Sequence, residues 1–277
     1  MSKSKQVAAK PANNVSGQFS SIFAVVMIPV LLITAILIFQ NVLGAGSNFE
    51  GGDNKNHPIP GNFLGMMYKG GFLVPLLMMS FMLVVAVAFE RLFTLTVAKG
   101  KGSINTLVKK VQGFLNADQI DAAITECNKQ KGSVANIIRS GLEKYREVSG
   151  ATDLDKDQKL AAIQKEVEEA TSLELPSLER NLVILSTMSS IATLLGLLGT
   201  VFGMIRAFSA IATSGAPDAV ALSSGISEAL INTALGISTS AFSIILYNYF
   251  TTRIDKMTYA IDEAGFSIAQ NFAAKHR

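Results

Sequence analysis

The sequence is poor in the residues that build metal centres and disulfide frameworks. It has no tryptophan, one cysteine (Cys127) and two histidines (His57 and His276) that lie far apart. A single cysteine cannot form an intrachain disulfide, and so few Cys and His residues give no metal cluster of recognised spacing. We therefore expect neither a metal site nor a bound cofactor.

Charge is also scarce. Charged residues make up 16% of the 277 residues, whereas an ordinary soluble domain carries about 25%. The deficit is concentrated in four long apolar stretches, a distribution typical of a protein that crosses a lipid bilayer. The net charge is only +3, and the positive residues lie near the ends of the apolar stretches, which argues against nucleic acid as a partner.

Each apolar stretch is long enough to cross a bilayer as a helix, which takes about 20 residues. We place spanning helices at 21–43, 71–98, 182–212 and 219–252. The first stretch could instead be a signal peptide, but it exceeds the roughly 7–15 apolar residues of such a peptide, and the glycines that follow make a poor cleavage site. We therefore predict an uncleaved helix. Glu90 and Arg91 lie late in the second stretch, where long side chains can reach the interface.

The segments between the spans are polar. They are a tail at 1–20 that we expect to be disordered, a loop at 44–70 rich in Gly, Asn and Pro, a charged insert at 99–181, a link at 213–218 and a tail at 253–277. Helical spacing in the insert predicts three or four amphipathic helices and no sheet, and the last tail suggests a short helix. The fold class is therefore an all-α polytopic membrane protein with long helices extending into the cytoplasm.

Basic residues predict the topology. They are concentrated in the first tail, at the start of the insert and in the last tail. By the positive-inside rule, these segments lie in the cytoplasm and the segments 44–70 and 213–218 lie on the opposite side. Both termini are then cytoplasmic.

The third and fourth stretches carry polar and small residues at helical spacing. The fourth contains one acid, Glu228, although a charge at the centre of a membrane helix costs about 2.5–3.5 kcal/mol on insertion scales. Its helix face also carries Gly225, Asn232, Gly236, Thr239 and Ser243, and the third stretch has Ser186, Ser189, Ser190, Thr193, Gly196 and Thr200. Such stripes either pack two helices closely or line a wet cavity, and the GxxxG pair of Gly199 and Gly203 favours packing.

The depth of Glu228 allows two interpretations. A helix that begins near Ser224 would put the carboxylate at the interface, where the helix dipole stabilises it. A helix that begins at Asp218, which is the better N-cap, would put Glu228 about 15 Å along the axis and near the middle of the membrane. We favour the mid-membrane position.

Two motifs resemble signatures of the MotA/TolQ/ExbB proton-channel family. Residues 194–205 read LLGLLGTVFGMI, which is similar to the family signature LLGLLGTVxGMIxAF, and residues 225–236 read GISEALINTALG, which is similar to GIxEALxxTALG. Shorter matches are FERL at 89–92 and YNYF at 247–250. The resemblance covers about residues 70–255. Thr193 and Phe242 stand where the family usually has proline, and the span at 21–43 lies outside the usual three-span core.

The resemblance implies a proton-driven complex that this subunit forms with a smaller partner. It implies a homopentamer that forms a ring in the bacterial inner membrane, around a helix pair from a smaller, ExbD-like single-span subunit whose membrane aspartate carries protons. Thr200 and Thr233 match the pore threonines of the family, and Glu228 matches its ExbB-type glutamate, with Asn232 beside it. Gly196, Gly199, Gly203, Gly225 and Gly236 are the expected helix-packing positions. The implied task is to energise TonB-type transport through a TonB-like protein; TolQ-like and MotA-like roles are the alternatives.

Two other classes of protein explain the sequence less well. An intramembrane enzyme needs a nucleophile with a base or a metal, and the spans contain no histidine to serve that chemistry. A structural scaffold accounts for the glycines but not for Glu228 beside Asn232 and Thr233. We therefore predict a non-enzymatic, proton-driven motor subunit, and we rank the MotA-like role lowest because a flagellar stator should have a larger cytoplasmic insert.

Overall fold

The computed structural model describes residues 15–214 and 219–275 of the chain. Most of the predicted tail at 1–20, most of the link at 213–218 (including Asp218) and His276 lie outside this part. The described part is helical, as predicted, and its only bridge between extended residues joins Phe49 to Pro58. Four helices are long and apolar enough to cross a membrane, which confirms the all-α polytopic fold class.

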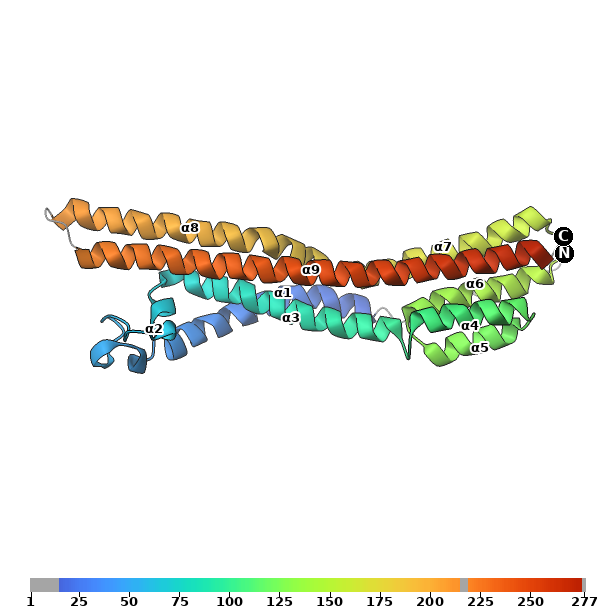
Figure 1. The fold of residues 1–277 in the computed structure, drawn as a ribbon, viewed down its shortest axis with the longest axis horizontal. Helices are drawn as coiled ribbons and strands as arrows, with labels where there is room; N and C mark the ends of the chain where they lie inside the picture. The colour runs from blue at the N-terminus through green and yellow to red at the C-terminus, as the bar shows by residue number, and fades with distance from the viewer. Residues whose placement is uncertain (1–14, 215–218, 276–277) are drawn as a thin grey trace. The chain divides into compact units, whose positions relative to one another are not determined.

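The four apolar helices lie where the sequence predicted them (Figure 1). Their bounds are α1 Val15–Ile38, α3 Val74–Lys99, α8 Leu182–Ser214 and α9 Ala219–Lys275, with a π-helical turn at Phe39–Leu43 after α1. Their most apolar windows have mean hydropathies of 1.7 to 2.6. The described residues fall into two compact units, one within residues 1–83 and 191–240 and the other within residues 84–190 and 241–277.

Helix α9 is longer than the sequence suggested. It is a single helix of 57 residues, where we predicted a span followed by a separate short helix. No proline or glycine lies between Phe250 and Gly265 to end the helix. Its last part buries Ile254, Met257 and Ile261 on one face, so packing also favours continuation.

Four amphipathic helices precede α8, as predicted for the insert. They are α4 Ile104–Asn116, α5 Ile120–Gln130, α6 Ser133–Ser149 and α7 Lys156–Glu179. They pack with the last part of α9, where Tyr145 meets Phe272 edge to face at 5.0 Å. Asp155 and Gln158 form a capping box at the start of α7, which satisfies two backbone donors of its first turn.

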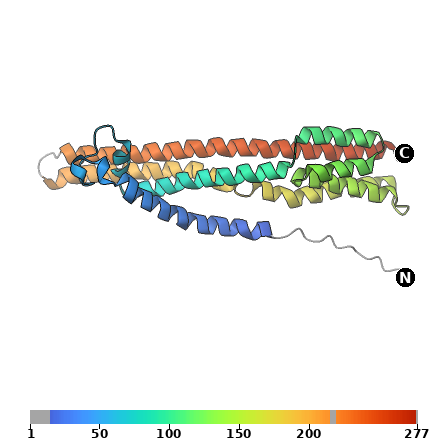
Figure 2. The ribbon, with the colours of Figure 1, turned by 90° about the horizontal axis from the view of Figure 1, so that it is seen from below.

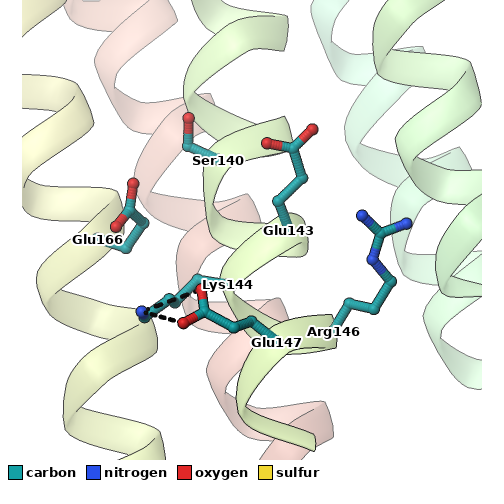
Figure 3. Close-up of a pocket in the computed structure, with 6 residues that line it drawn as sticks. All are labelled: Ser140, Glu143, Lys144, Arg146, Glu147 and Glu166. Atoms are coloured by element: carbon teal, nitrogen blue, oxygen red, sulfur yellow. Dashed lines mark hydrogen bonds and ion pairs between the residues drawn. The ribbon is translucent and has the colours of Figure 1, made fainter. Parts of the chain in front are cut away.

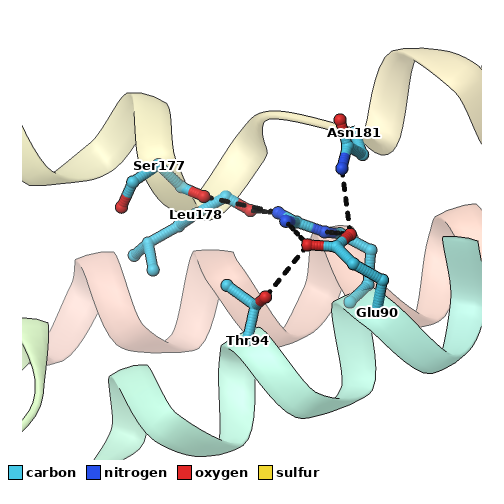
Figure 4. A network of polar contacts seen from close by, with 6 residues as sticks. Glu90, Thr94, Ser177, Leu178 and Asn181 are labelled. Atoms are coloured by element: carbon cyan, nitrogen blue, oxygen red, sulfur yellow. Dashed lines mark hydrogen bonds and ion pairs between the residues drawn. The ribbon is translucent and has the colours of Figure 1, made fainter. Parts of the chain in front are cut away.

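A network of polar contacts joins the second span to the elbow between α7 and α8, here residues 177–181 (Figure 4). Arg91 is 2% exposed, and its Nη1 donates to the carbonyls of Leu178 at 3.0 Å and Ser177 at 3.3 Å. Glu90 accepts from Arg91 Nε at 2.6 Å and from Asn181 Nδ2 at 3.0 Å. Arg91 therefore turns its charged end into the protein, where its donors satisfy the unpaired carbonyls at the end of a helix, and its position at the membrane interface stays a prediction.

Residues 44–70 form an organised cap rather than the irregular loop that we predicted. Within this cap, helix α2 runs from Phe63 to Tyr68. Asn48 is the hub: its Nδ2 donates to Val42 O at 2.7 Å and Leu43 O at 3.0 Å, and its Oδ1 accepts from Asn62 Nδ2 at 3.1 Å. Asn62 in turn caps α2. Asparagine side chains supply both donors and acceptors, so a segment that reads as a loop by composition can fold tightly.

Candidate ion pathway at the α8–α9 hairpin

Helices α8 and α9 run antiparallel along a seam of small residues (Figure 2). All five glycines predicted to pack, Gly196, Gly199, Gly203, Gly225 and Gly236, are buried in this seam. A methyl group added at Gly203 would lie 2.6 Å from Gly225 O, and one added at Gly236 would lie 2.5 Å from Ala192 O. The backbones of the two helices therefore touch, as small residues allow in membrane helices.

The polar stripe of α9 faces the inside of the protomer. Asn232, Thr239 and Ser243 are buried together with Glu228. The stripe of α8 differs, because Ser186, Ser190 and Thr193 are exposed. The two stripes therefore meet only in part: Gly196 of the α8 stripe packs against Gly236 of the α9 stripe, whereas Ser186, Ser190 and Thr193 are open to a neighbour or to solvent.

Glu228 forms an ion pair with Arg206 of α8. Arg206 Nη1 donates to both carboxylate oxygens of Glu228, at 2.7 and 2.8 Å. The glutamate side chain is 9% exposed and the arginine side chain 53%. The carboxylate is thus held in the protein while the guanidinium reaches its surface over the ring of Phe72, 5.8 Å from the ring centroid.

The turn before α3 closes the site from the other side. Gly71 has φ +78°, and a methyl group there would collide with Glu228 Oε1, so glycine is needed both for the backbone and for the space. Asn232 Nδ2 donates to Gly70 O at 2.8 Å. The site therefore combines side chains of α8 and α9 with the backbone of the Gly70–Gly71 turn.

This arrangement bears on the depth of Glu228. Its carboxylate lies against Gly71, three residues before α3 begins at Val74. The apolar stretch of α3 also begins at Gly71, and polar residues of the cap precede it. Glu228 therefore lies at the level where α3 begins, and its depth in a bilayer stays a prediction.

The two predicted pore threonines are half-buried and bonded within the hairpin. Thr200 donates to Leu197 O in its own helix. Thr233 Oγ1 lies 3.1 Å from Ala229 O and 3.3 Å from Gly196 O of α8. Both hydroxyl groups also keep acceptor lone pairs that water could use. Among the described residues, no hydrogen bond joins Glu228 to Thr233.

Asn232 lies between them and is the most buried polar group of the site. It is 1% exposed, and its side chain fills the space that Gly199 leaves. Its Oδ1 has no hydrogen-bond partner in the described part of the chain. An unpaired buried acceptor costs about 1–3 kcal/mol, so Asn232 offers a place where a water donor would be bound favourably.

Sequence reasoning missed Arg206 as a member of the site. Arg206 is the one charged residue of the apolar stretch 182–212, but no role was assigned to it from the sequence. The signal was available, since residues at similar distances from the short link of an antiparallel hairpin lie opposite each other, as Gly196 and Gly236 do. Arg206 and Glu228 lie on either side of the link in the same way and have opposite charges.

A cavity elsewhere does not resemble a binding site (Figure 3). It lies between α6 and α7, has a volume of about 490 Å³ and is lined by Ser140, Glu143, Lys144, Arg146, Glu147 and Glu166. Its charges have both signs, and Lys144 Nζ is already 3.1 Å from Glu147. The described residues also contain no group of His, Cys, Asp and Glu that could hold a metal ion.

Comparisons with known proteins agree with the motifs. Residues 129–263 match the MotA/TolQ/ExbB proton channel family. The Tol-Pal system protein TolQ of Pseudomonas aeruginosa is 31% identical over 45% of this chain and 54% of its own length. The biopolymer transport protein ExbB of Pseudomonas putida is 24% identical over 73% of this chain and 61% of its own length. A putative ExbB homolog of Methanothermobacter thermautotrophicus is 33% identical over 48% and 43%. The chain spans about half the length of the curated relatives it matches.

Proposed function

We propose that this chain is the ExbB-like subunit of a proton-driven motor that energises TonB-type transport across the outer membrane, because residues 129–263 match the MotA/TolQ/ExbB proton channel family. The family is one of proton channels rather than enzymes. The observation that carries the proposal is the buried Glu228, which Arg206 holds in a hairpin that has no other charged side chain among its described residues between 182 and 250. An ionisable pair at this place in a membrane helix hairpin is expensive and indicates function.

The proposed assembly is a homopentamer in the bacterial inner membrane, with α8 and α9 innermost around the helix pair of an ExbD-like subunit. The exposed polar stripe of α8 supports this arrangement, because Ser186, Ser190 and Thr193 would otherwise face lipid. The family resemblance alone supplies the number five. Native mass spectrometry, with and without a co-expressed single-span partner, tests the proposal: stable monomers or dimers in both samples would contradict it.

In the proposed mechanism the acid of the ExbD-like partner carries the proton, and residues of this chain line the path along which the proton moves. Thr200 and Thr233 present hydroxyl groups that orient water without holding charge, and Asn232 offers a buried acceptor beside them. Glu228 and Arg206 neutralise each other, so the wall carries little net charge when the proton passes. The drive is about 2.3 kcal/mol per charge per 100 mV.

A TolQ-like role is the second candidate, favoured by the 31% identity to a Tol-Pal system protein. The two roles predict different defects in a deletion strain. An ExbB-like subunit is needed for TonB-dependent uptake, whereas a TolQ-like subunit is needed for envelope integrity. Complementation of one defect and not the other by this chain distinguishes them.

Removing the two threonine hydroxyls tests the water path directly. Thr200→Val and Thr233→Val keep the side-chain shape, and we expect the double variant to lose at least tenfold in proton-motive-force-dependent uptake at normal subunit levels. Thr171→Val in α7 is the matched control, since that hydroxyl also bonds within its own helix, to Val167 O, outside the hairpin. Equal activity of the double variant and the control would remove the basis for a threonine-lined path.

The proposed topology places the cap outside the cytoplasm and α5 inside it. An impermeant maleimide added to intact spheroplasts is expected to label His57→Cys but not Asn128→Cys; both native side chains are exposed. The native Cys127 gives no background, because it is buried and burial raises the pKa of its thiol to about 12, so that thiolate is scarce at neutral pH. The reverse labelling pattern would sink this orientation.

A further inference from the structure

The cap separates its charges from its apolar residues. Residues 50–57 include Glu50, Asp53, Lys55 and His57, all exposed, whereas residues 58–68 carry no charged side chain. A cap surrounded by water on all sides has no reason for this division. One side of the cap is therefore suited to water and the other to an apolar surrounding.

The apolar side is built around α2. Gly65 turns inward, where a methyl group would lie 2.7 Å from Asn48 O, so α2 is pressed against the cap by its glycine face. The opposite face presents large apolar side chains outward. These exposed side chains are Ile59, Leu64, Met66, Phe63 (65% exposed) and, just after α2, Phe72 (58% exposed).

Both ends of the cap are fixed to membrane helices. Asn48 ties it to the end of the first span through Val42 O and Leu43 O, and Gly70 is held by Asn232 of α9. The candidate spans themselves end at Leu43 and begin again at Gly71. The cap is thus held at the level where two helices leave the bilayer, and it cannot move away from the lipid surface without breaking these bonds.

We propose that α2, with Ile59 and Phe72, inserts into the interfacial layer of the leaflet at which the first span ends, so that the partner of this face is lipid. Aromatic and aliphatic side chains on an uncharged short helix beside span ends fit that layer. The consequence for the ion pathway is direct. Only Lys69 separates α2 from the Gly70–Gly71 turn, so the lipid anchor fixes the level at which this turn meets Glu228 and Asn232.

The chain contains no tryptophan, so Phe63→Trp introduces a single indole whose fluorescence reports on this position alone. The purified variant is placed in vesicles of phosphatidylethanolamine and phosphatidylglycerol, with or without bromine on the acyl chains. We expect blue-shifted emission from Trp at position 63 and at least twofold quenching by brominated lipid. His57→Trp, on the charged side, is the matched control and should respond to aqueous iodide instead.

Two outcomes would overturn the proposal. Quenching of the position-63 indole by iodide as strongly as at position 57 would place α2 in water. Blue-shifted emission that neither iodide nor brominated lipid quenches would place it against protein, either a second copy of the chain or a partner. Leu64→Trp provides a second reporter on the same face, so that a local disturbance at one position cannot decide the result.

Discussion

Replacement of Glu228 by alanine is expected to abolish proton-motive-force-dependent activity while the protein still inserts into the membrane. The variant removes the buried acid of the α8–α9 hairpin but leaves the apolar faces and the glycine seam unchanged. Uptake or partner movement is measured in cells with normal subunit levels. Glu228→Gln keeps a hydrogen-bond acceptor for Arg206 and removes the charge, so its loss of activity would indicate that the negative charge is needed, and its retained activity that the hydrogen bond is sufficient. Full activity of Glu228→Ala would contradict a role of this acid in ion transfer.

Substitution of Arg206, the ion-pair partner of Glu228, provides the control for effects on stability. Arg206→Gln leaves a carboxylate in a site where that side chain is only 9% exposed, whereas Glu228→Gln leaves a guanidinium that is 53% exposed. Breaking a buried pair costs about 3–5 kcal/mol, and an exposed pair contributes about 0.2–1 kcal/mol. Arg206→Gln should therefore lower the melting temperature more than Glu228→Gln does. The double variant should recover stability but not activity, which separates folding from function.

Gly203→Ala and Gly236→Ala are expected to destabilise the protein strongly, because each added methyl group would meet backbone atoms of the facing helix. Backbone cannot rotate away as a side chain can, so the helices must separate. Overpacking of this kind costs about 1–3 kcal/mol or more. Thermal unfolding followed by size-exclusion chromatography of the detergent-solubilised protein measures the effect.

The matched control is Gly113→Ala in α4. A methyl group there has no atom within 4 Å, and alanine is favoured over glycine in a helix interior by about 1 kcal/mol. This variant should be neutral or slightly stabilised. Equal loss of stability in all three variants would show that the effect comes from glycine replacement in general and not from the seam.

Hydrophobic length predicted the four apolar helices, because the bilayer thickness sets that length independently of packing. The spacing of Ile137, Ile138 and Leu142 likewise indicated a helix that buries one face, as α6 does. Composition misled at the cap, where the asparagines that suggested a loop instead hold α2 and the end of the first span together. Local propensity does not contain such pairings.

The same limit applies to the candidate site. The intramembrane acid was visible from the sequence because Glu228 is costly there. Its contact with Arg206 and with the Gly70–Gly71 turn depends on which faces of three helices meet. The sequence measured the depth of Glu228 along one helix, from a cap at Asp218, and the mid-membrane position stays a prediction. The start of α3 is the better reference, and it comes from a segment more than 150 residues earlier in the chain.

The elbow around Arg91 has a consequence for biogenesis. Glu90 and Arg91 neutralise each other within α3 itself, so a nascent chain can insert this span before any later segment exists. The carbonyls that Arg91 finally binds lie 86 and 87 residues further along, and Asn181 lies 91 residues from Glu90. During synthesis Glu90 therefore pairs with Arg91 before the residues that carry its final carbonyl acceptors, Ser177 and Leu178, have been translated. Arg91 then reaches its carbonyl acceptors only late in assembly. Loss of Glu90 should therefore first impair the insertion of α3 into the membrane.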